Sequence, residues 1–225
     1  MVIGLLLAAG GSRRLGEPKA LLTDATGEPL VSRVVRRLGE AGCPEVVVVV
    51  GAERARVCAA VARTGGSVPV SIVAHAGWAG GMGTSIACGI GHVASRVTSG
   101  AGAGASKAPH AQPLVPTAVL IAAVDMPSVT TAHLAQLLTA SAGGSRRAAS
   151  TYAAADGTSI RGIPAVLPRA DWPWLLALDG DRGARVLLAE PGTAAVPLTD
   201  GALDLDTPAD VARWRSAQGL PTPTP

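Results

Sequence analysis

Two cationic side chains follow the first apolar run of the chain and could bind phosphate. The run Val2–Ala8 predicts a buried strand of a parallel sheet, and small residues at 9–11 follow it directly. Glycine lets backbone N–H groups approach a ligand closely, and such groups in a turn form an anion-binding concavity. Arg14 and Lys19 add full positive charge there, and Lys19 is one of only two lysines in the chain. The loop therefore favours a phosphate site at the carboxyl edge of the sheet over a solvated basic loop.

A carboxylate occupies the corresponding place after a later strand. Thr117–Val124 is another buried apolar run, and Asp125 follows it. Ligands of α/β sheets bind beyond the carboxyl ends of the strands, and Mg²⁺ usually takes one or two carboxylates together with substrate phosphates. The alternative is a turn-forming aspartate ahead of a helix over about 130–140, although Ser128 or Thr130 could cap that helix without it. The residues alone are compatible with both roles.

A glycine-rich stretch between these two loops could also contact a ligand. Three glycines in four positions, at 80, 81 and 83, precede Thr84 and Ser85 at the predicted start of a helix. Such a segment suits backbone contact with a planar base or a phosphate. An ordinary loop in which Thr84 or Ser85 is the N-cap explains the spacing equally well.

Several other chemistries lack the residues they need. The first loop departs from a P-loop because Glu17 and Pro18 precede Lys19 and no Ser or Thr follows, and it lacks the dinucleotide fingerprint G-x-G-x-x-G. The four histidines do not cluster in the sequence, and no Ser or Cys lies in a nucleophile motif such as G-x-S-x-G. Phosphoryl chemistry fits this pattern, because the enzyme then mainly positions reactants and stabilises charge.

The remaining pattern predicts the elements that would position these residues. Apolar residues in 29–41 recur at helical spacing, and the arginines at 33, 36 and 37 lie off that stripe, so we expect them on a solvated face. Further strands are predicted at 45–50, 68–74, 148–154, 162–167 and 193–198, and further helices at 53–63, 84–93, 130–140 and 208–215, with a short one ending at 189. This order predicts an α/β fold with a doubly wound, mostly parallel sheet in three αβα layers, and the strand pair around Asp156 and Gly157 is a small antiparallel elaboration.

Length and composition limit the class of protein. A chain of 225 residues suits one α/β domain, placed at 1–217, with a flexible insertion rich in small residues at 98–116 and a disordered tail at 218–225. The net charge of +3 is too mild, and aromatic residues are too few, for a nucleic-acid partner. No run approaches the roughly 20 apolar residues of a membrane span. Three cysteines without C-x-x-C spacing indicate reduced thiols in a cytoplasmic protein.

The first loop resembles a long family signature. Residues 7–19, LAAGGSRRLGEPK, match L-A-A-G-x-S-x-R-[ML]-G-x-P-K, the pattern of the MobA-like nucleotidyltransferases and, within them, of the molybdenum cofactor cytidylyltransferases. Four further segments resemble family motifs in order: G-M-G-[ST]-S at 81–85, D-x-P at 125–127, G-x-P at 162–164 and G-D-x-G-A-R at 180–185, and D-x-D-T-P follows at 204–208. The resemblance implies a Rossmann-like nucleotidyltransferase fold over roughly residues 2–215, apart from the insertion.

The resemblance also implies a role for particular residues. It favours ligand binding by the 81–85 segment and metal binding by Asp125, and it suggests Asp206 as a second metal ligand; Asp204 and Asp210 are expected to be structural. An N-cap role explains Asp181 equally well, whereas Arg182 and Arg185 suit an anionic acceptor. The implied site comprises Arg14 and Lys19 as catalytic residues; Leu7, Ala8, Ala9, Gly10, Gly11, Ser12, Gly81, Met82, Gly83 and Ser85 as nucleotide contacts; Asp125 and Asp206 as Mg²⁺ ligands; and Gly162, Pro164, Arg182 and Arg185 as acceptor contacts.

The implied activity is transfer of CMP from CTP to the terminal phosphate of molybdopterin, with release of pyrophosphate. Ala9 resembles the cytidylyl form of the motif, whereas Asp125-Met126-Pro127 is closer to the guanylyl form, so guanylyl transfer stays open. Two further functions also stay open. One is that of an NAD(P)H-dependent oxidoreductase offshoot of the family, and the other is that of a non-catalytic protein that delivers the cofactor to a molybdoenzyme or its chaperone.

Overall fold

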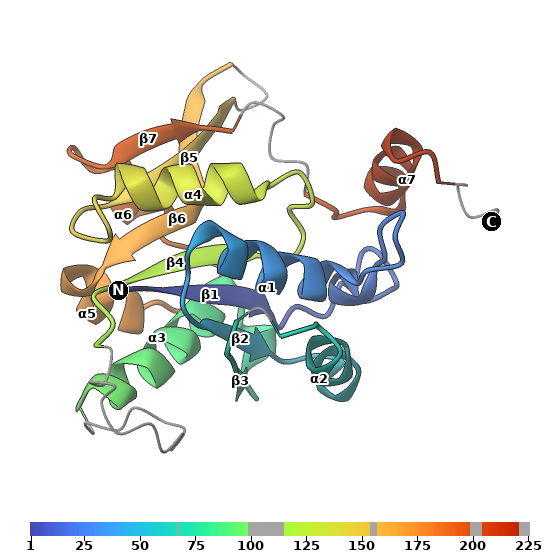
Figure 1. Ribbon diagram of the computed structural model, residues 1–225, viewed down its shortest axis with the longest axis horizontal. Helices are drawn as coiled ribbons and strands as arrows, with labels where there is room; N and C mark the ends of the chain where they lie inside the picture. The colour runs from blue at the N-terminus through green and yellow to red at the C-terminus, as the bar shows by residue number, and fades with distance from the viewer. Residues whose placement is uncertain (67, 99–114, 154–156, 199–203, 221–225) are drawn as a thin grey trace.

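A seven-stranded sheet organises the molecule, in the order β3-β2-β1-β4-β6-β5-β7. The computed structural model describes residues 1–66, 68–98, 115–153, 157–198 and 204–220. The strands are β1 (Val2–Ala8), β2 (Val46–Val50), β3 (Val70–Ala74), β4 (Ala118–Ala123), β5 (Ala148–Ala153), β6 (Ser159–Pro168) and β7 (Ala194–Pro197). Only β6 among them runs antiparallel to its neighbours β4 and β5. The sheet is therefore mostly parallel with a local antiparallel elaboration, as the sequence predicts (Figure 1).

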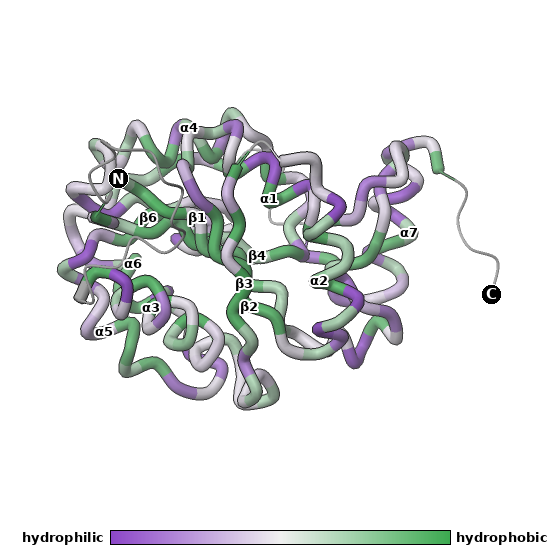
Figure 2. The backbone as a smooth tube through the Cα atoms, turned by 60° about the horizontal axis from the view of Figure 1, so that its bottom comes forward, coloured by the Kyte–Doolittle hydropathy of each residue, from purple (hydrophilic) through white to green (hydrophobic). Residues whose placement is uncertain are grey.

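Helices cover both faces of this sheet. The α-helices are α1 (Leu30–Ala41), α2 (Arg54–Ala62), α3 (Met82–Thr98), α4 (Thr131–Ala140), α5 (Trp172–Leu176), α6 (Arg185–Ala189) and α7 (Pro208–Ala217), and the 3₁₀ helices are η1 (Lys19–Leu21), η2 (Trp78–Gly80) and η3 (Arg169–Asp171). In Figure 2, α1 and α4 lie on one side of the strands, and α3, α5 and α6 lie on the other. This arrangement confirms the three-layer α/β fold.

Two hydrophobic cores result from the alternation of side chains along the strands. Val2 and Leu6 of β1 pack with α1, α2 and α4 on one face, whereas Ile3, Leu5 and Leu7 pack with α3, α5 and α6 on the other. All seven residues of β1 are buried, which is typical of a strand at the centre of a parallel sheet. The strand can therefore hold the loop that follows it in a fixed position.

Helix ends explain where the sequence predictions hold and where they fail. Gly42 ends α1 in the left-handed conformation, and Thr207 caps α7 through a capping box with Asp210. Helix α3 begins at Met82, so Thr84 lies inside the helix and is not its N-cap. An N-cap role for Asp181 is also wrong, because α6 begins after Ala184.

The predicted solvated face of α1 is wrong for Arg37. Its guanidinium is half-buried and donates to the backbone carbonyls of Pro127, at 3.2 Å, and of Val129. Burial, followed by repulsion from Arg33 and Arg36, lowers the pKa of Arg37 to about 10. The arginine thus links α1 to the segment that follows Asp125.

Three predicted segments lie largely outside the described residues. Residues 99–114 of the predicted insertion and the turn residues 154–156 belong to this part of the chain, as do residues 221–225 of the predicted tail. Within the part that the structure describes, no helix is both long enough and apolar enough to span a membrane.

Candidate functional site

The loop after β1 positions a lysine at the carboxyl edge of the sheet. Ser12 adopts a left-handed conformation with φ of 48°, and its carbonyl accepts from the N–H groups of Leu15 and Gly16, which turns the chain. The Ser12 hydroxyl accepts a hydrogen bond from the backbone N–H of Lys19 at 3.0 Å. Helix η1 begins at Lys19, so the backbone of this residue is held by the loop on one side and by the helix on the other.

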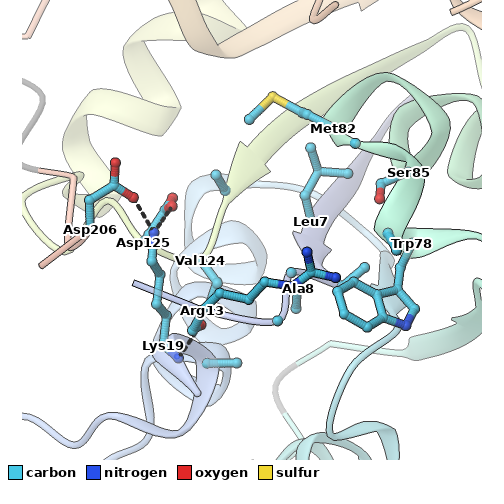
Figure 3. A pocket seen from close by; sticks show the side chains of 18 of the residues that line it. Leu7, Ala8, Arg13, Lys19, Trp78, Met82, Ser85, Val124, Asp125 and Asp206 are labelled. Atoms are coloured by element: carbon cyan, nitrogen blue, oxygen red, sulfur yellow. Dashed lines mark hydrogen bonds and ion pairs between the residues drawn. The ribbon is translucent and has the colours of Figure 1, made fainter. Parts of the chain in front are cut away.

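Three distant segments converge on the Lys19 ammonium. Its Nζ lies 3.0 Å from Oδ2 of Asp125, after β4, and 2.5 Å from Oδ1 of Asp206, before α7. Arg14 Nη2 lies 2.8 Å from the other oxygen of Asp206. The backbone N–H of Leu205 donates to the carbonyl of Asp125 at 3.1 Å, which brings the third segment against the second. Figure 3 shows the lysine side chain reaching between the two carboxylates.

The charges in this cluster stabilise one another. Burial alone would lower the pKa of Lys19, but the charges and hydrogen bonds of Asp125 and Asp206 outweigh burial and raise the pKa. The hydrogen bond from Lys19 lowers the pKa of Asp206, and Arg14 adds to this effect. Lys19 and Asp206 are therefore both charged at neutral pH.

A cavity of about 580 Å³ opens over this cluster and the glycine loop. Its walls come from the ends of β1 and β4, from the first loop, and from the segment before α3. The lining residues are Leu7, Ala8, Ala9, Gly10, Gly11, Ser12, Arg13, Arg14, Lys19, Ala20, Trp78, Ala79, Gly81, Met82, Ser85, Ala123, Val124, Asp125, Asp181 and Asp206. The structure thus brings together both predicted catalytic residues, both predicted metal ligands and every predicted nucleotide contact except Gly83.

Trp78 closes one side of the first cavity. A Cβ added to Gly11 would lie 2.8 Å from two ring atoms of Trp78, and one added to Gly51 would lie 2.5 Å from its Cβ. The glycines after β1 and β2 therefore leave the space that the indole occupies. The Arg13 guanidinium lies 5.8 Å from the centre of the indole ring (Figure 3). Neither Arg13 nor Trp78 is among the predicted site residues.

A second cavity, of about 430 Å³, adjoins the first. Its lining residues are Met82, Ala123, Asp125, Met126, Tyr152, Gly162, Ile163, Asp181, Arg182, Gly183, Ala184, Arg185, Val186, Leu188 and Asp204. Four residues line both cavities: Met82, Ala123, Asp125 and Asp181. Of the predicted acceptor contacts, Gly162, Arg182 and Arg185 line this cavity, whereas Pro164 does not.

Two predicted residues outside the cavities have backbone roles. The Pro164 carbonyl accepts a hydrogen bond from the Ser150 hydroxyl at 2.7 Å, in the buried part of the sheet. The Gly83 N–H donates to the carbonyl of Gly180 at 2.8 Å, and a Cβ on Gly83 would lie 2.6 Å from the carbonyl oxygen of Arg182. Gly83 thus holds the segment before α3 against the segment before α6, at the border of the two cavities.

Asp204 and Asp181 line the cavities, although the sequence favours a structural role for Asp204. Desolvation of the Asp204 carboxyl, followed by repulsion from Asp125 and Asp206, raises its pKa to about 6. Asp204 could have been found from its place in the same motif as Asp206, although only the packing of the segment before α7 brings it to the second cavity. Asp181 could have been found from its place in the same motif as Arg182.

The carboxylate pair fits a divalent metal ion. Asp125 and Asp206 direct oxygens onto a single cation, the Lys19 ammonium. The described residues contain no group of three or more His, Cys, Asp or Glu side chains that could hold a metal. A hard cation that keeps several waters and takes further oxygens from phosphates matches this donor set.

The fold and the site define an α/β protein of the nucleotidyltransferase class. Residues 4–196 match the MobA-like NTP transferase domain, and the chain belongs to this family. The chain is 33% identical over 193 residues to nicotine blue oxidoreductase of Paenarthrobacter nicotinovorans, and the match covers 84% of this chain and 82% of that protein.

Solved structures share the fold. Rv0371c of Mycobacterium tuberculosis H37Rv superposes with a TM-score of 0.68 at 24% identity, covering 96% of this chain and 98% of that one, and it has also been crystallised in complex with manganese. CMP:2-keto-3-deoxy-manno-octonic acid synthetase complexed with CTP has a TM-score of 0.67 at 15% identity, covering 97% of this chain and 98% of that one. At these identities the likeness is one of fold.

Proposed function

We propose that the protein is a metal-dependent nucleotidyltransferase that transfers CMP from CTP to the terminal phosphate of molybdopterin or a closely related acceptor. The observation that carries the proposal is the convergence of Lys19 and Asp206, which line the first cavity, on Asp125, which lines both cavities. A nucleotide in the first cavity and an acceptor in the second would meet beside Asp125, which lines both. Membership of the family and the CTP and manganese complexes of the structural neighbours support this class of ligand.

The cationic loop would stabilise the charge that develops during the reaction. A terminal phosphate oxygen of the acceptor attacks the α-phosphorus, and the bond from that phosphorus to the bridging oxygen of pyrophosphate breaks. Negative charge then builds on the leaving pyrophosphate, and Arg14, Lys19 and the backbone N–H groups of 9–11 would neutralise it. A divalent ion, Mg²⁺ by preference, held by Asp125 and Asp206 would add positive charge beside the phosphate oxygens.

The second cavity suits an acceptor with a flat ring and a phosphate. Met126 and Ile163 give it an apolar surface, and Arg182 and Arg185 give it positive charge. Guanidinium groups bind phosphate oxygens in a forked geometry. An acceptor with its phosphate directed at the side of the cavity that Asp125 lines would point toward the nucleotide.

The preference for CTP rests on Ala9. This residue is buried, lines the first cavity, and is fixed there because its carbonyl accepts from the N–H of Ala52 at 3.0 Å. The guanylyl form of the motif has glycine at this position, and we infer that the methyl group of Ala9 would crowd a purine, so pyrophosphate release with molybdopterin should be at least about tenfold faster with CTP than with GTP. Faster pyrophosphate release with GTP would show that the protein is a guanylyltransferase. The absence of pyrophosphate release with either nucleotide would reject nucleotidyl transfer.

Variants of the charged cluster test the residue roles. Lys19→Met and Asp125→Asn should each lower the rate of pyrophosphate release about 10²–10³-fold, as loss of one electrostatic contact at a transition state typically does. Arg56→Met is the matched control, because Arg56 lies on α2 and its side chain is 63% exposed beside Glu53. If either site variant matched this control, the assignment of that residue would be wrong.

A second candidate is an oxidoreductase that uses NAD(P)H. The 33% identity to nicotine blue oxidoreductase favours it, and the partly apolar second cavity could also hold a dye. Oxidation of NAD(P)H by the protein in the presence of a quinone-like dye, without pyrophosphate release from any nucleoside triphosphate, would replace the first proposal. A protein that binds molybdopterin and shows neither activity would instead be a carrier.

A further inference from the structure

The Lys19 ammonium lies between the two carboxylates that are the candidate metal ligands. It is hydrogen-bonded to Asp125 and Asp206 at once, and its side chain is only 15% exposed. Arg14 takes the remaining oxygen of Asp206. Two positive side chains, Lys19 and Arg14, thus already contact this pair of carboxylates in the free protein, so a metal would have to compete with them for the carboxylate oxygens.

We propose that Lys19 acts as an internal counter-ion that keeps a divalent metal off the Asp125–Asp206 pair until a triphosphate binds. This inference rests on the proposed function, since it assigns the order in which that site fills. A metal alone would share its carboxylates with an ammonium in direct contact, and like charges so close in a half-buried site repel strongly. The free protein should therefore bind the metal weakly.

A triphosphate gives the lysine another partner. The side chain of Lys19 is a flexible four-carbon stem, so its head can turn while the backbone N–H stays on the Ser12 hydroxyl. The first cavity contains both the lysine and the glycine loop, and phosphates bound by that loop would draw the ammonium away from the carboxylates. Metal and triphosphate would then tighten each other's binding by the same factor.

Binding of Mn²⁺ to the protein without nucleotide tests the inference directly. The free ion is measured by electron paramagnetic resonance, and the protein is titrated as wild type, Lys19→Met, Lys19→Gln and Arg14→Met. Both Lys19 variants should bind Mn²⁺ at least about tenfold more tightly than wild type. Arg14→Met should have a smaller effect, because Arg14 contacts only Asp206 and its side chain is 73% exposed. The control Arg56→Met removes the same charge far from the cluster and should leave the affinity unchanged.

The second arm adds CTP with a non-hydrolysable α,β-methylene bridge. Wild type should then bind Mn²⁺ at least about tenfold more tightly than it does alone, and this gain should shrink in Lys19→Met. Circular dichroism shows whether each variant is folded, and Lys19→Gln retains a donor if the methionine variant is not.

The inference is overturned if folded Lys19 variants bind Mn²⁺ no more tightly than wild type. Wild-type protein that binds Mn²⁺ alone as tightly as with the analogue would overturn it too. The proposed function fails by a different result, the absence of any pyrophosphate release, and the first arm involves no nucleotide. The two failures are therefore separate observations.

Discussion

The packing of Trp78 against the glycine loop predicts unequal effects at two adjacent glycines. A Cβ at Gly11 would lie 2.8 Å from both Cη2 and Cζ3 of the indole, whereas a Cβ at Gly10 would meet no atom within 4 Å. Because carbon atoms pack best at about 3.5–4.0 Å, Gly11→Ala must displace the loop or the ring by about 0.7 Å or more. Gly10→Ala requires no such displacement.

The expected cost follows from the clash. Overpacking of this size costs about 1–3 kcal/mol, and in a chain of this length 1 kcal/mol lowers the melting temperature by about 2–4 °C. Gly11→Ala should therefore melt roughly 2–12 °C below wild type. Gly10→Ala shares the effect of alanine on the unfolded chain, about 0.4–1 kcal/mol in favour of folding, and should melt at or slightly above the wild-type temperature. Thermal unfolding followed by circular dichroism measures both.

A second substitution locates the cause of the loss. Trp78→Leu removes the two ring atoms that meet the new methyl group, so the cost of Gly11→Ala should be smaller in that background. The double-mutant cycle should give a coupling free energy of about 1 kcal/mol or more between positions 11 and 78. The reasoning would be refuted if the two glycine variants melted at the same temperature. It would also be refuted if Gly11→Ala cost as much free energy of unfolding in the Trp78→Leu background as in the wild type.

Two further predictions concern groups that hold the scaffold of the site. Burial lowers the pKa of His133, which is hydrogen-bonded to Ser150, so the unfolded chain binds the proton more readily and the free energy of unfolding should fall as the pH drops below about 6.5. Urea unfolding at pH 7.5 and 5.5 should show a smaller fall for His133→Gln than for wild type; an equal fall would contradict this. Arg37→Met should lower the free energy of unfolding by about 2–3 kcal/mol, because two carbonyls after Asp125 lose a charged donor, whereas Arg36→Met breaks only partly exposed ion pairs and should cost at most about 1 kcal/mol. Equal costs in urea unfolding would show that Arg37 does not brace that segment.

The sheet and the charged loop could be predicted from the sequence because each is marked by a short, continuous pattern of residues. The apolar run Val2–Ala8 and the strand at 46–50 are short, continuous and followed by small residues, so their burial follows from composition alone. That Lys19 lies beside Asp125 follows from topology. Both residues come after strands that pair in parallel, with Leu7 opposite Ala123, so the two loops must emerge at the same edge.

Contacts that depend on packing between distant segments could not be predicted from the sequence. The sequence predicts that Arg37 is a surface residue, because its position on the helix lies off the apolar stripe. The chain after β4 nevertheless passes close enough for Arg37 to donate to the carbonyls of Pro127 and Val129. Trp78 reads as part of an irregular loop, and its role is visible only where two glycines from separate strands leave room for it. Such contacts depend on the tertiary arrangement, and no periodicity or spacing in the sequence indicates them.

The charged cluster also separates the two candidate activities. NADH carries one pyrophosphate and no further phosphate, whereas a nucleoside triphosphate carries about two more negative charges, and Arg14 and Lys19 would serve the larger charge only when another cation satisfies Asp125 and Asp206. Nucleotidyl transfer by the proposed mechanism would therefore link tight nucleotide binding to a divalent metal. Hydride transfer would leave the lysine between its carboxylates and make nucleotide affinity independent of the metal. The same four side chains thus favour different ligands according to which cation holds the carboxylates.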